Sequence, residues 1–327
     1  MHDDASHNAA PASRWHDAVT TFDLLLQQTI NGLSLGAMYA LLALGFTLVY
    51  GILELINFSH FNVFMVGSFV ALFVLQGFGL SGQEVILTGL PLAGVLLATF
   101  LITMTFCGGL GVVVERITLR PLRNVKGPAA MITSIGVSYI LFNVILLTVG
   151  ADSKNFPNPL PTIRWQIGGA TLDFRVVLIW AIALLLMGIL YMFVQRSRMG
   201  KAMRATAQDA EAARMMGVEV DKVIMMAFFL GSALAGAGGL IFGLYYNFTS
   251  FIIGFTAGLR AFTAAVLGGI GNVPGAMVGG VLIGLIEAMG GQFIATAWTD
   301  VIIFSILVLV LVFKPAGLFG RIAPNKS

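Results

Sequence analysis

The residue patterns that could support bond chemistry are few in this chain. Gly32-Leu-Ser-Leu-Gly36 matches the Gly-x-Ser-x-Gly pattern in which a serine hydrolase holds its nucleophile. That chemistry requires a strand-to-helix turn beneath the serine and a histidine later in the chain. Ser34 lies instead in a long apolar segment, and no histidine follows His60. We therefore expect no catalytic residue in this chain.

Nucleotide-binding and metal-binding patterns are also missing from the sequence. No Gly-x-x-x-x-Gly-Lys-Ser/Thr loop occurs, so any ATP that drives this protein must be bound by another chain. The single cysteine, Cys107, lies in an apolar stretch and is expected to be a packing residue. His2, His7 and His16 are too loosely spaced to indicate a metal site. We expect this chain to bind neither a metal nor a cofactor.

The most informative segment lies between two apolar stretches, at residues 196–222. It is rich in Ala and Met and is expected to form two short helices. Asp209 can cap the second helix, Glu211 lies in its first turn, and Gly217 fits a helix stop. A helix of about twelve residues, roughly 18 Å long, could lie in a groove on a partner. The alternative is a solvated helix without a partner.

The elements that carry these residues must lie in a membrane. The chain of 327 residues is 58% hydrophobic and 10% charged, with a mean hydropathy of +0.93, whereas soluble domains contain about 25% charged residues. A membrane span needs about 20 apolar residues. The candidate spans are Leu24–Tyr50, Ile56–Gln76, Val85–Val114, Ala129–Val149, Val176–Val194, Val223–Tyr245, Phe255–Ile270, Gly275–Met289 and Val301–Phe313. The sequence therefore predicts an all-α integral membrane protein, a polytopic bundle of eight or nine transmembrane helices. The pieces of Gly254–Gly291 are short enough to be re-entrant or broken helices.

The distribution of basic residues predicts the orientation of the bundle. Thirteen of the eighteen Lys and Arg residues lie in the segments 115–128 and 196–222 and in the tail from Lys314 onward. By the positive-inside rule these three segments, and with them the C-terminus, are cytoplasmic, and the loop Gly150–Arg175 faces outward. Nine crossings would then place the N-terminus outside, and eight would place it inside. Basic residues in separate short loops do not indicate nucleic-acid binding.

Small residues recur at a spacing of four within the apolar segments. Gly32 and Gly36, Gly275 and Gly279, and Gly280 and Gly284 form small-xxx-small patterns. Such patterns let helix backbones approach closely in lipid. Tight packing within one subunit is the favoured interpretation, and a subunit interface or a moving pathway is the alternative.

Polar residues inside or beside the spans mark candidate positions of a translocation pathway, because burying them in lipid is costly. Glu54, Asn57, Ser59 and His60 cluster at a break between the first two spans, and Asn31 lies earlier. For a lone asparagine, a hydrogen bond between helices is the favoured alternative. A cleft with few polar groups and apolar walls would suit a zwitterion with an apolar side chain. More scattered polar residues are Asn143, Asn247, Arg260 and Glu287.

Three segments together resemble a known family. Glu211-Ala-Ala-x-x-x-Gly217 resembles the coupling loop of bacterial ABC importer permeases. The stretch from Asn31 to His60 resembles the opening of LivH-type branched-chain amino-acid permeases, and 262–280 resembles their Gly-rich late segment. The resemblance covers the chain from residue 25 to about residue 320.

Two departures from the family pattern bear on the branch and on the cargo. The Ile-x-Leu-Pro that usually follows the coupling motif is absent, which points to the branched-chain amino-acid and sugar branch. Phe61 and Asn62 stand where such permeases often carry Gly and Glu, which weakens any transfer of exact substrate identity.

The resemblance implies a permease subunit of an ABC importer for branched-chain amino acids in the bacterial inner membrane. Residues 24–318 would form the transmembrane permease domain with the coupling loop 196–222, between a disordered polar extension, 1–23, and a cytoplasmic tail, 319–327. The implied partners are a second permease, identical or homologous, two subunits that bind ATP and Mg, and a periplasmic or extracellular substrate-binding protein. The implied coupling residues are Arg204, Asp209, Glu211, Ala212, Ala213 and Gly217.

Other functions stay open on the sequence. Urea, short amides and aromatic acids are alternative cargos for a permease of this kind. An ion-coupled secondary transporter is the main alternative mechanism, but it would need intramembrane carboxylates or ion-coordinating breaks. Glu54 and Glu287 are few for that purpose, and such a transporter leaves the segment 196–222 unexplained. A membrane enzyme is a more distant alternative.

Overall fold

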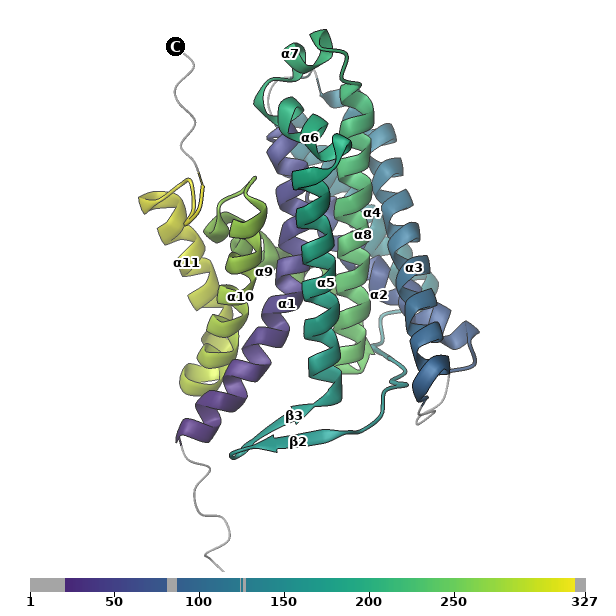
Figure 1. Cartoon of the computed structure of the whole chain (residues 1–327), viewed down its shortest axis with the longest axis vertical. Coiled ribbons are helices and arrows are strands. Elements are labelled where there is room, and N and C mark those ends of the chain that lie inside the picture. The colour runs from purple at the N-terminus through teal and green to yellow at the C-terminus, as the bar shows by residue number, and fades with distance from the viewer. Residues whose placement is uncertain (1–20, 81–86, 124, 126–127, 321–327) are drawn as a thin grey trace, which may run out of the picture.

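The computed structural model describes residues 21–80, 87–123, 125 and 128–320 (Figure 1). Long apolar helices make up most of this part of the chain, because a helix bonds its backbone polar groups within one segment, as an apolar chain in lipid requires. The long helices are α1 (Thr21–Leu53), α2 (Ser59–Gly77), α3 (Gly89–Val114), α4 (Ala129–Val149), α5 (Phe174–Arg196), α8 (Val220–Tyr246), α9 (Ile253–Gly268), α10 (Val273–Gly290) and α11 (Thr299–Phe313). Each predicted span overlaps one of these helices, and the bundle is the polytopic all-α membrane fold that the sequence predicts.

Seven helical stretches in the described residues are long and apolar enough to cross a membrane, and α9 is a shorter apolar helix. The last of these stretches, 273–313, contains both α10 and α11. After α11, Leu318 and Phe319 donate backbone hydrogen bonds to the carbonyls of Leu267 and Gly268, which precede α10. The end of α11 therefore lies beside the start of α10, and the two helices form a hairpin. Between them lie a π-turn (Gly291–Ala295) and a 3₁₀ turn (Thr296–Trp298).

Short elements lie outside the long helices. Two helices, α6 (Arg198–Gln208) and α7 (Ala210–Met215), precede α8, and a π-turn (Glu115–Leu119) and a 3₁₀ turn (Arg120–Leu122) follow α3. Four strands, which the all-α prediction did not include, form two antiparallel pairs: β2 (Arg164–Ile167) with β3 (Ala170–Asp173), and β1 (Lys154–Asn155) with β4 (Phe248–Thr249). The turn of the β2–β3 hairpin is Gly168-Gly169, and Gly168 has the positive φ of +63° that a tight hairpin turn requires.

The start of the first helix and the β2–β3 hairpin lie at the same end of the bundle. The backbone N–H groups of Gly169 and Thr171 donate to the side chains of Asp23 and Gln27, at 2.8 Å in each case. The expected disordered extension, 1–23, is therefore wrong for its last three residues, which form the first turn of α1. Asp23 is favoured there because a carboxylate suits a helix N-terminus. The rest of that extension lies outside the described residues.

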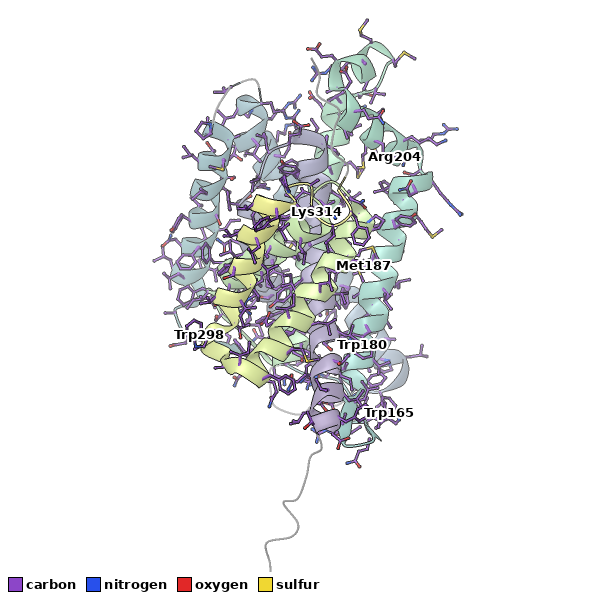
Figure 2. All side chains as sticks on the ribbon, turned by 90° about the vertical axis from the view of Figure 1, so that its left-hand side faces the viewer. Trp165, Trp180, Met187, Arg204, Trp298 and Lys314 are labelled. Carbon is purple, nitrogen blue, oxygen red and sulfur yellow. The ribbon has the colours of Figure 1, made fainter. Side chains whose placement is uncertain are left out.

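The basic segments lie at the other end of the bundle. Ala213 and Val220 share an apolar cluster with Leu119 and with the last turn of α1. The chain after α11 also lies at this end, because Leu318 bonds to Leu267 at the end of α9, and Gly271 approaches Gly51. Figure 2 shows Arg204 and Trp165 at opposite ends of the molecule. The start of α1 and the chain after α11 are therefore on opposite sides, as nine crossings would predict.

The glycine patterns pack helices within this chain. A Cβ atom built on Gly36 would lie 2.7 Å from the Cα of Val281, and one on Gly284 would lie 2.2 Å from the backbone N of Gly36. A Cβ on Gly279 would lie 2.1 Å from the carbonyl oxygen of Ala264. Real Cβ atoms cannot approach so closely, so α10 lies against α1 and α9 only because these positions lack a side chain. This confirms the interpretation of the patterns as packing within one subunit.

Candidate functional site

The helices α6 and α7 form as predicted, each with a side-chain cap. Ser197 accepts a hydrogen bond from the backbone N of Gly200, and Asp209 accepts from those of Glu211 and Ala212, at 2.9 and 3.0 Å. The chain leaves α7 through Gly217, which has a φ of +84°. Two short helices with an Asp cap and a Gly stop are therefore confirmed.

The expected length of the second helix is wrong, because α7 contains six residues and not about twelve. The backbone N–H groups of Gly217 and Val218 fold back onto the carbonyls of Arg214 and Ala213, at 3.0 Å in each case. These bonds close the helix as soon as the left-handed glycine is reached. The segment is therefore a compact projection, the α7 knob, at the basic end of the molecule. Figure 1 shows α7 at the outermost point of that end.

One side of α7 anchors it, and the other side is exposed. Ala213 is 5% exposed and packs in the cluster that contains Val220. Met215 and Met216 are 88% and 85% exposed, beside the exposed residues Glu211 and Ala212. Exposed methionines outside the apolar part of a bundle are a feature of protein-binding surfaces, because the thioether adapts to different partner shapes.

Arg204 differs from the other implied coupling residues in its position. Its Nη1 donates a hydrogen bond to the carbonyl of Val194 in the last turn of α5. A cation is favoured at a helix C-terminus, where carbonyl groups lack partners. Arg204 therefore fixes α6 against α5, while the exposed surface belongs to α7.

An ion-pair cluster ties the start of α8 to the end of α3. Asp221, in the first turn of α8, accepts from Arg120 Nη2 at 2.5 Å and from Arg123 Nη1 at 2.8 Å. Arg123 also pairs with Glu115, which is 2% exposed. From the sequence, these arginines were expected only to indicate the orientation of the bundle. In the structure they connect α8, which directly follows α7, to the neighbouring helix.

The break between α1 and α2 is present, but its polar residues serve the helices themselves. Asn57 Oδ1 accepts from the backbone N of Ser59 at 3.1 Å and from its hydroxyl at 2.6 Å. His60 Nε2 lies 3.2 Å from the carbonyl of Leu42 on α1. All three predicted pathway residues are at most 6% exposed. Asn57 and Ser59 bond to each other where α2 begins, and His60 holds α2 against α1.

The other two predicted pathway residues lie apart from this cluster and from each other. Glu54 is exposed just after α1, with a φ of +53°. Asn31 bonds to Gln27 and Gln28 within α1. At 1.5 Å per residue, Asn31 and Glu54 are about 35 Å apart along the axis of α1. The five residues therefore do not form one site.

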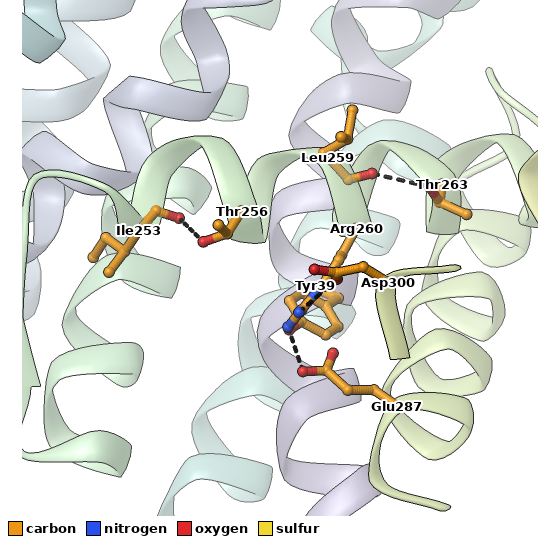
Figure 3. A network of polar contacts seen from close by, with 8 residues as sticks. All are labelled: Tyr39, Ile253, Thr256, Leu259, Arg260, Thr263, Glu287 and Asp300. Atoms are coloured by element: carbon orange, nitrogen blue, oxygen red, sulfur yellow. Dashed lines mark hydrogen bonds and ion pairs between the residues drawn. The ribbon is translucent and has the colours of Figure 1, made fainter. Parts of the chain in front are cut away.

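A second polar group connects four helices, although two of its members, Arg260 and Glu287, are scattered in the sequence (Figure 3). Arg260 on α9 pairs with Glu287 on α10 and donates to Asp300 Oδ1 on α11 from Nε at 3.0 Å and from Nη2 at 2.7 Å. Its Nη1 also lies 3.3 Å from the hydroxyl of Tyr39 on α1. The side chains of Arg260 and Glu287 are 20% and 12% exposed. We call these residues the Arg260 group.

An open cavity of about 280 Å³ lies beside the Arg260 group. Its lining includes Gln28, Leu35, Arg260, Glu287, Gln292 and Thr299. The sequence could have indicated the pairing of Arg260 with Glu287, because opposite charges within apolar segments need partners in a membrane. Nothing in the sequence pattern pointed to Tyr39 or Asp300.

Comparison with known proteins gives consistent matches. The family model described as "Branched-chain amino acid transport system / permease component" matches residues 28–311. The high-affinity branched-chain amino acid transport system permease protein LivH of Escherichia coli (strain K12) is 40% identical over 305 residues, which cover 92% of this chain and 97% of that protein. BraD of Pseudomonas aeruginosa, a permease protein of a system with the same description, is 38% identical over 90% of this chain and 96% of its own. LivM of E. coli (strain K12) is 24% identical over 91% of this chain and 71% of its own. No solved structure matches.

Proposed function

The chain belongs to the family of branched-chain amino-acid transport permeases, and from this premise we propose that it carries branched-chain amino acids across the bacterial inner membrane as one permease subunit of an ATP-driven importer. It is a multi-pass membrane protein, and bond chemistry is left to other chains. The observation that carries the proposed mechanism is the exposed knob of α7, which offers a docking surface at the basic end.

The proposed assembly rests on two features: the sequence has no ATP-binding loop, and α7 presents an exposed surface. Two ATP-binding subunits that hold ATP and Mg would dock on Glu211, Ala212 and the methionines of α7. A second permease, identical or homologous, would complete the pathway. The basic end would face the cytoplasm, together with the C-terminus, and a periplasmic or extracellular binding protein would deliver the amino acid to the opposite end. Movement of α7 would reach the bundle through α8 and its ion pairs with Arg120 and Arg123.

The test of this function is transport by the complete system. The chain is produced with the ATP-binding subunits and the binding protein of its own system, and uptake of radiolabelled leucine into vesicles is measured with and without ATP inside. We expect ATP-dependent uptake, co-purification of the chain with the ATP-binding subunits, and no ATP hydrolysis by the chain alone. Competition by urea, short amides or aromatic acids in place of branched-chain amino acids would redirect the cargo assignment.

Substitutions in α7 test the coupling role. A Cβ at Gly217 would meet no described atom within 4 Å, so its positive φ is the main obstacle to a side chain. Val is strained in this conformation by about 1–2 kcal/mol, whereas Asn adopts it more readily. In Gly217→Val we expect uptake and substrate-stimulated ATP hydrolysis to fall together by about five- to thirtyfold. Gly217→Asn is the matched control and should retain most of both activities.

Ala212→Trp tests the docking surface without changing the backbone, because Ala212 is exposed. It should impair uptake and hydrolysis at normal expression. Normal activity in both Ala212→Trp and Gly217→Val would remove α7 as the coupling element. Uptake that needs a proton or sodium gradient and no ATP-binding subunit would instead favour an ion-coupled transporter.

A further inference from the structure

The Arg260 group does not balance its own charge. Arg260 is the one cation of the group and bonds to two carboxylates, Glu287 and Asp300. Tyr39 adds a hydroxyl but no charge. The group therefore carries a net charge of about −1 beside a cavity that lies between apolar helices. The side chain of Asp300 is 56% exposed, so the carboxylate in apolar surroundings is that of Glu287, and its charge there favours the binding of a cation.

Two acceptor atoms of residues that line this cavity have no hydrogen-bond partner among the described residues. They are Glu287 Oε2 and Thr299 Oγ1, and both are buried. Thr299 as a whole is 4% exposed. Both residues line the cavity. Because a buried carboxylate oxygen or hydroxyl without a partner costs about 1–3 kcal/mol, the pair is suited to receive donors from a ligand.

The chemistry of the cavity narrows the class of ligand. A primary ammonium group has a single positive charge and three N–H donors, enough to reach both a carboxylate oxygen and a hydroxyl. Leu35 and Ala288 provide apolar wall, and the amides of Gln28 and Gln292, 3.0 Å apart, lie at the same cavity. Drug-sized ligands occupy pockets of about 300–1,000 Å³. A cavity of about 280 Å³ therefore has the size for a smaller molecule such as one amino acid.

We propose that the cavity between α1, α9, α10 and α11 binds the ammonium group of a zwitterionic amino acid through Glu287 and Thr299. Arg260 holds Glu287 in place, and the cavity wall at Leu35 contacts the apolar part of the ligand. The choice of an amino acid rather than another amine rests on the proposed function. The site would hold the cargo between its release by the binding protein and its exit at the basic end.

The test uses the assembled transporter in lipid nanodiscs without its binding protein. The probes are leucine, 3-methylbutylamine, which lacks the carboxylate, and 4-methylpentanoate, which lacks the ammonium group. Thermal unfolding is measured at millimolar probe, because a ligand that binds only the folded state raises the unfolding midpoint with its concentration. We expect leucine and the amine to raise the midpoint, and the acid to leave it unchanged.

Two substitutions locate the site. Glu287→Gln removes the charge and should weaken the apparent affinity for leucine and for the amine by about tenfold to a hundredfold. Thr299→Val removes only the hydroxyl and should weaken it by about threefold to tenfold. The matched control is Glu219→Gln, an exposed carboxylate at the basic end that pairs with Lys222, and it should bind like the unaltered protein. If Glu287→Gln fails to fold, Thr299→Val carries the test, because it keeps every charge of the Arg260 group.

Three results would overturn the proposal. They are stabilisation by 4-methylpentanoate equal to that by leucine, unaltered binding in both site variants, and stabilisation that follows sodium instead of the amine when choline replaces sodium in the buffer. The site and the proposed function can also fail separately. If leucine binds in a way that depends on Glu287 but is not taken up, the proposed site stands and the proposed permease function fails. If uptake is driven by ATP but leucine does not bind at this cavity, the permease function stands and the proposed site fails.

Discussion

At the scale of single residues, the partners of each polar side chain separate two roles. Asn57 and Ser59 bond to each other at the break between α1 and α2, His60 contacts α1, and all three are closed to solvent. Arg260 and Glu287 bond across helices and line a cavity. Both sets lie in apolar surroundings where an unpaired group is costly. A polar residue in a span therefore points to a pathway only when one of its atoms remains available to a ligand.

Removing Arg260 should destabilise the bundle far more than removing an exposed arginine. Breaking a buried ion pair costs about 3–5 kcal/mol because one charge is left buried and unpaired. We expect Arg260→Met to lower the thermal unfolding midpoint by several degrees, and the double variant Arg260→Met with Glu287→Gln to recover part of that loss. Thermal unfolding in nanodiscs, followed by the loss of monodisperse protein, is the measurement.

The control for this prediction is Arg164→Ala on β2. Arg164 pairs with Asp173 at 3.1 Å, but its side chain is 68% exposed. An exposed pair contributes about 0–1 kcal/mol, so this variant should unfold within a degree or two of the unaltered protein. Equal effects of Arg260→Met and Arg164→Ala would show that the Arg260 group does not stabilise the helices.

At the scale of elements, close backbone contacts decide which helices are neighbours. Lipid tails are as apolar as the side chains, so burying a side chain between helices gains little. Helices in lipid therefore associate through close packing of their side chains and backbones. The helices α1, α9 and α10 meet at glycines, whereas α3, α4 and α5 present bulky side chains such as Leu101, Leu147 and Leu184 outward. The first three form a tight unit, and the outward faces of the others suit contact with lipid.

Gly284→Ala should therefore be harmful, although alanine favours a helix. Its Cβ would lie 2.2 Å from the backbone N of Gly36 and 2.5 Å from the carbonyl oxygen of Gly32, so α1 and α10 must separate. Overpacking of this kind costs about 1–3 kcal/mol. Gly136→Ala on α4 is the matched control, because its Cβ would meet no described atom within 4 Å.

The measurement is the yield of folded protein and its unfolding midpoint. Gly136→Ala should be neutral or more stable by up to about 1 kcal/mol, since glycine has the lower helix propensity. If Gly284→Ala matched Gly136→Ala in both yield and midpoint, the close contact between α1 and α10 would be refuted.

At the scale of the whole molecule, the two ends differ in charge and in architecture. One end carries α6, α7 and the described basic residues of the segments after α3 and α5, and the other carries the β2–β3 hairpin (Figure 1). Positive charge is retained on the cytoplasmic side during insertion. The end that carries α7 is therefore expected inside, where ATP-binding subunits are available.

Cysteine labelling tests this orientation. Cys107 is fully buried and can remain as an unreactive background. Arg164→Cys on β2 should react with a membrane-impermeant maleimide in right-side-out vesicles, because Arg164 is exposed at the hairpin end. Lys201→Cys on α6 is also exposed and should react only after permeabilisation. If Lys201→Cys reacts in sealed vesicles and Arg164→Cys does not, the orientation is opposite to the one predicted.

The sequence by itself determined the features that depend on local chemistry. Apolar runs identified each long helix, because a backbone in lipid must satisfy its own hydrogen bonds. Asp209 and Gly217 identified the ends of α7, because capping and a left-handed stop act within a few residues. The glycine patterns also predicted close helix packing, because a glycine has no side chain to keep a neighbouring backbone away.

The tertiary structure alone decided which distant residues meet. Tyr39, Arg260, Glu287 and Asp300 come from four helices, and no spacing rule connects them. The predicted pathway residues from Asn31 to His60 are close in sequence, yet a continuous helix carries Asn31 and Glu54 far apart. In a helical membrane bundle, a site is formed by the register between helices. That register follows from packing contacts such as those of Gly36 with Gly284, which join parts of the chain far apart in sequence.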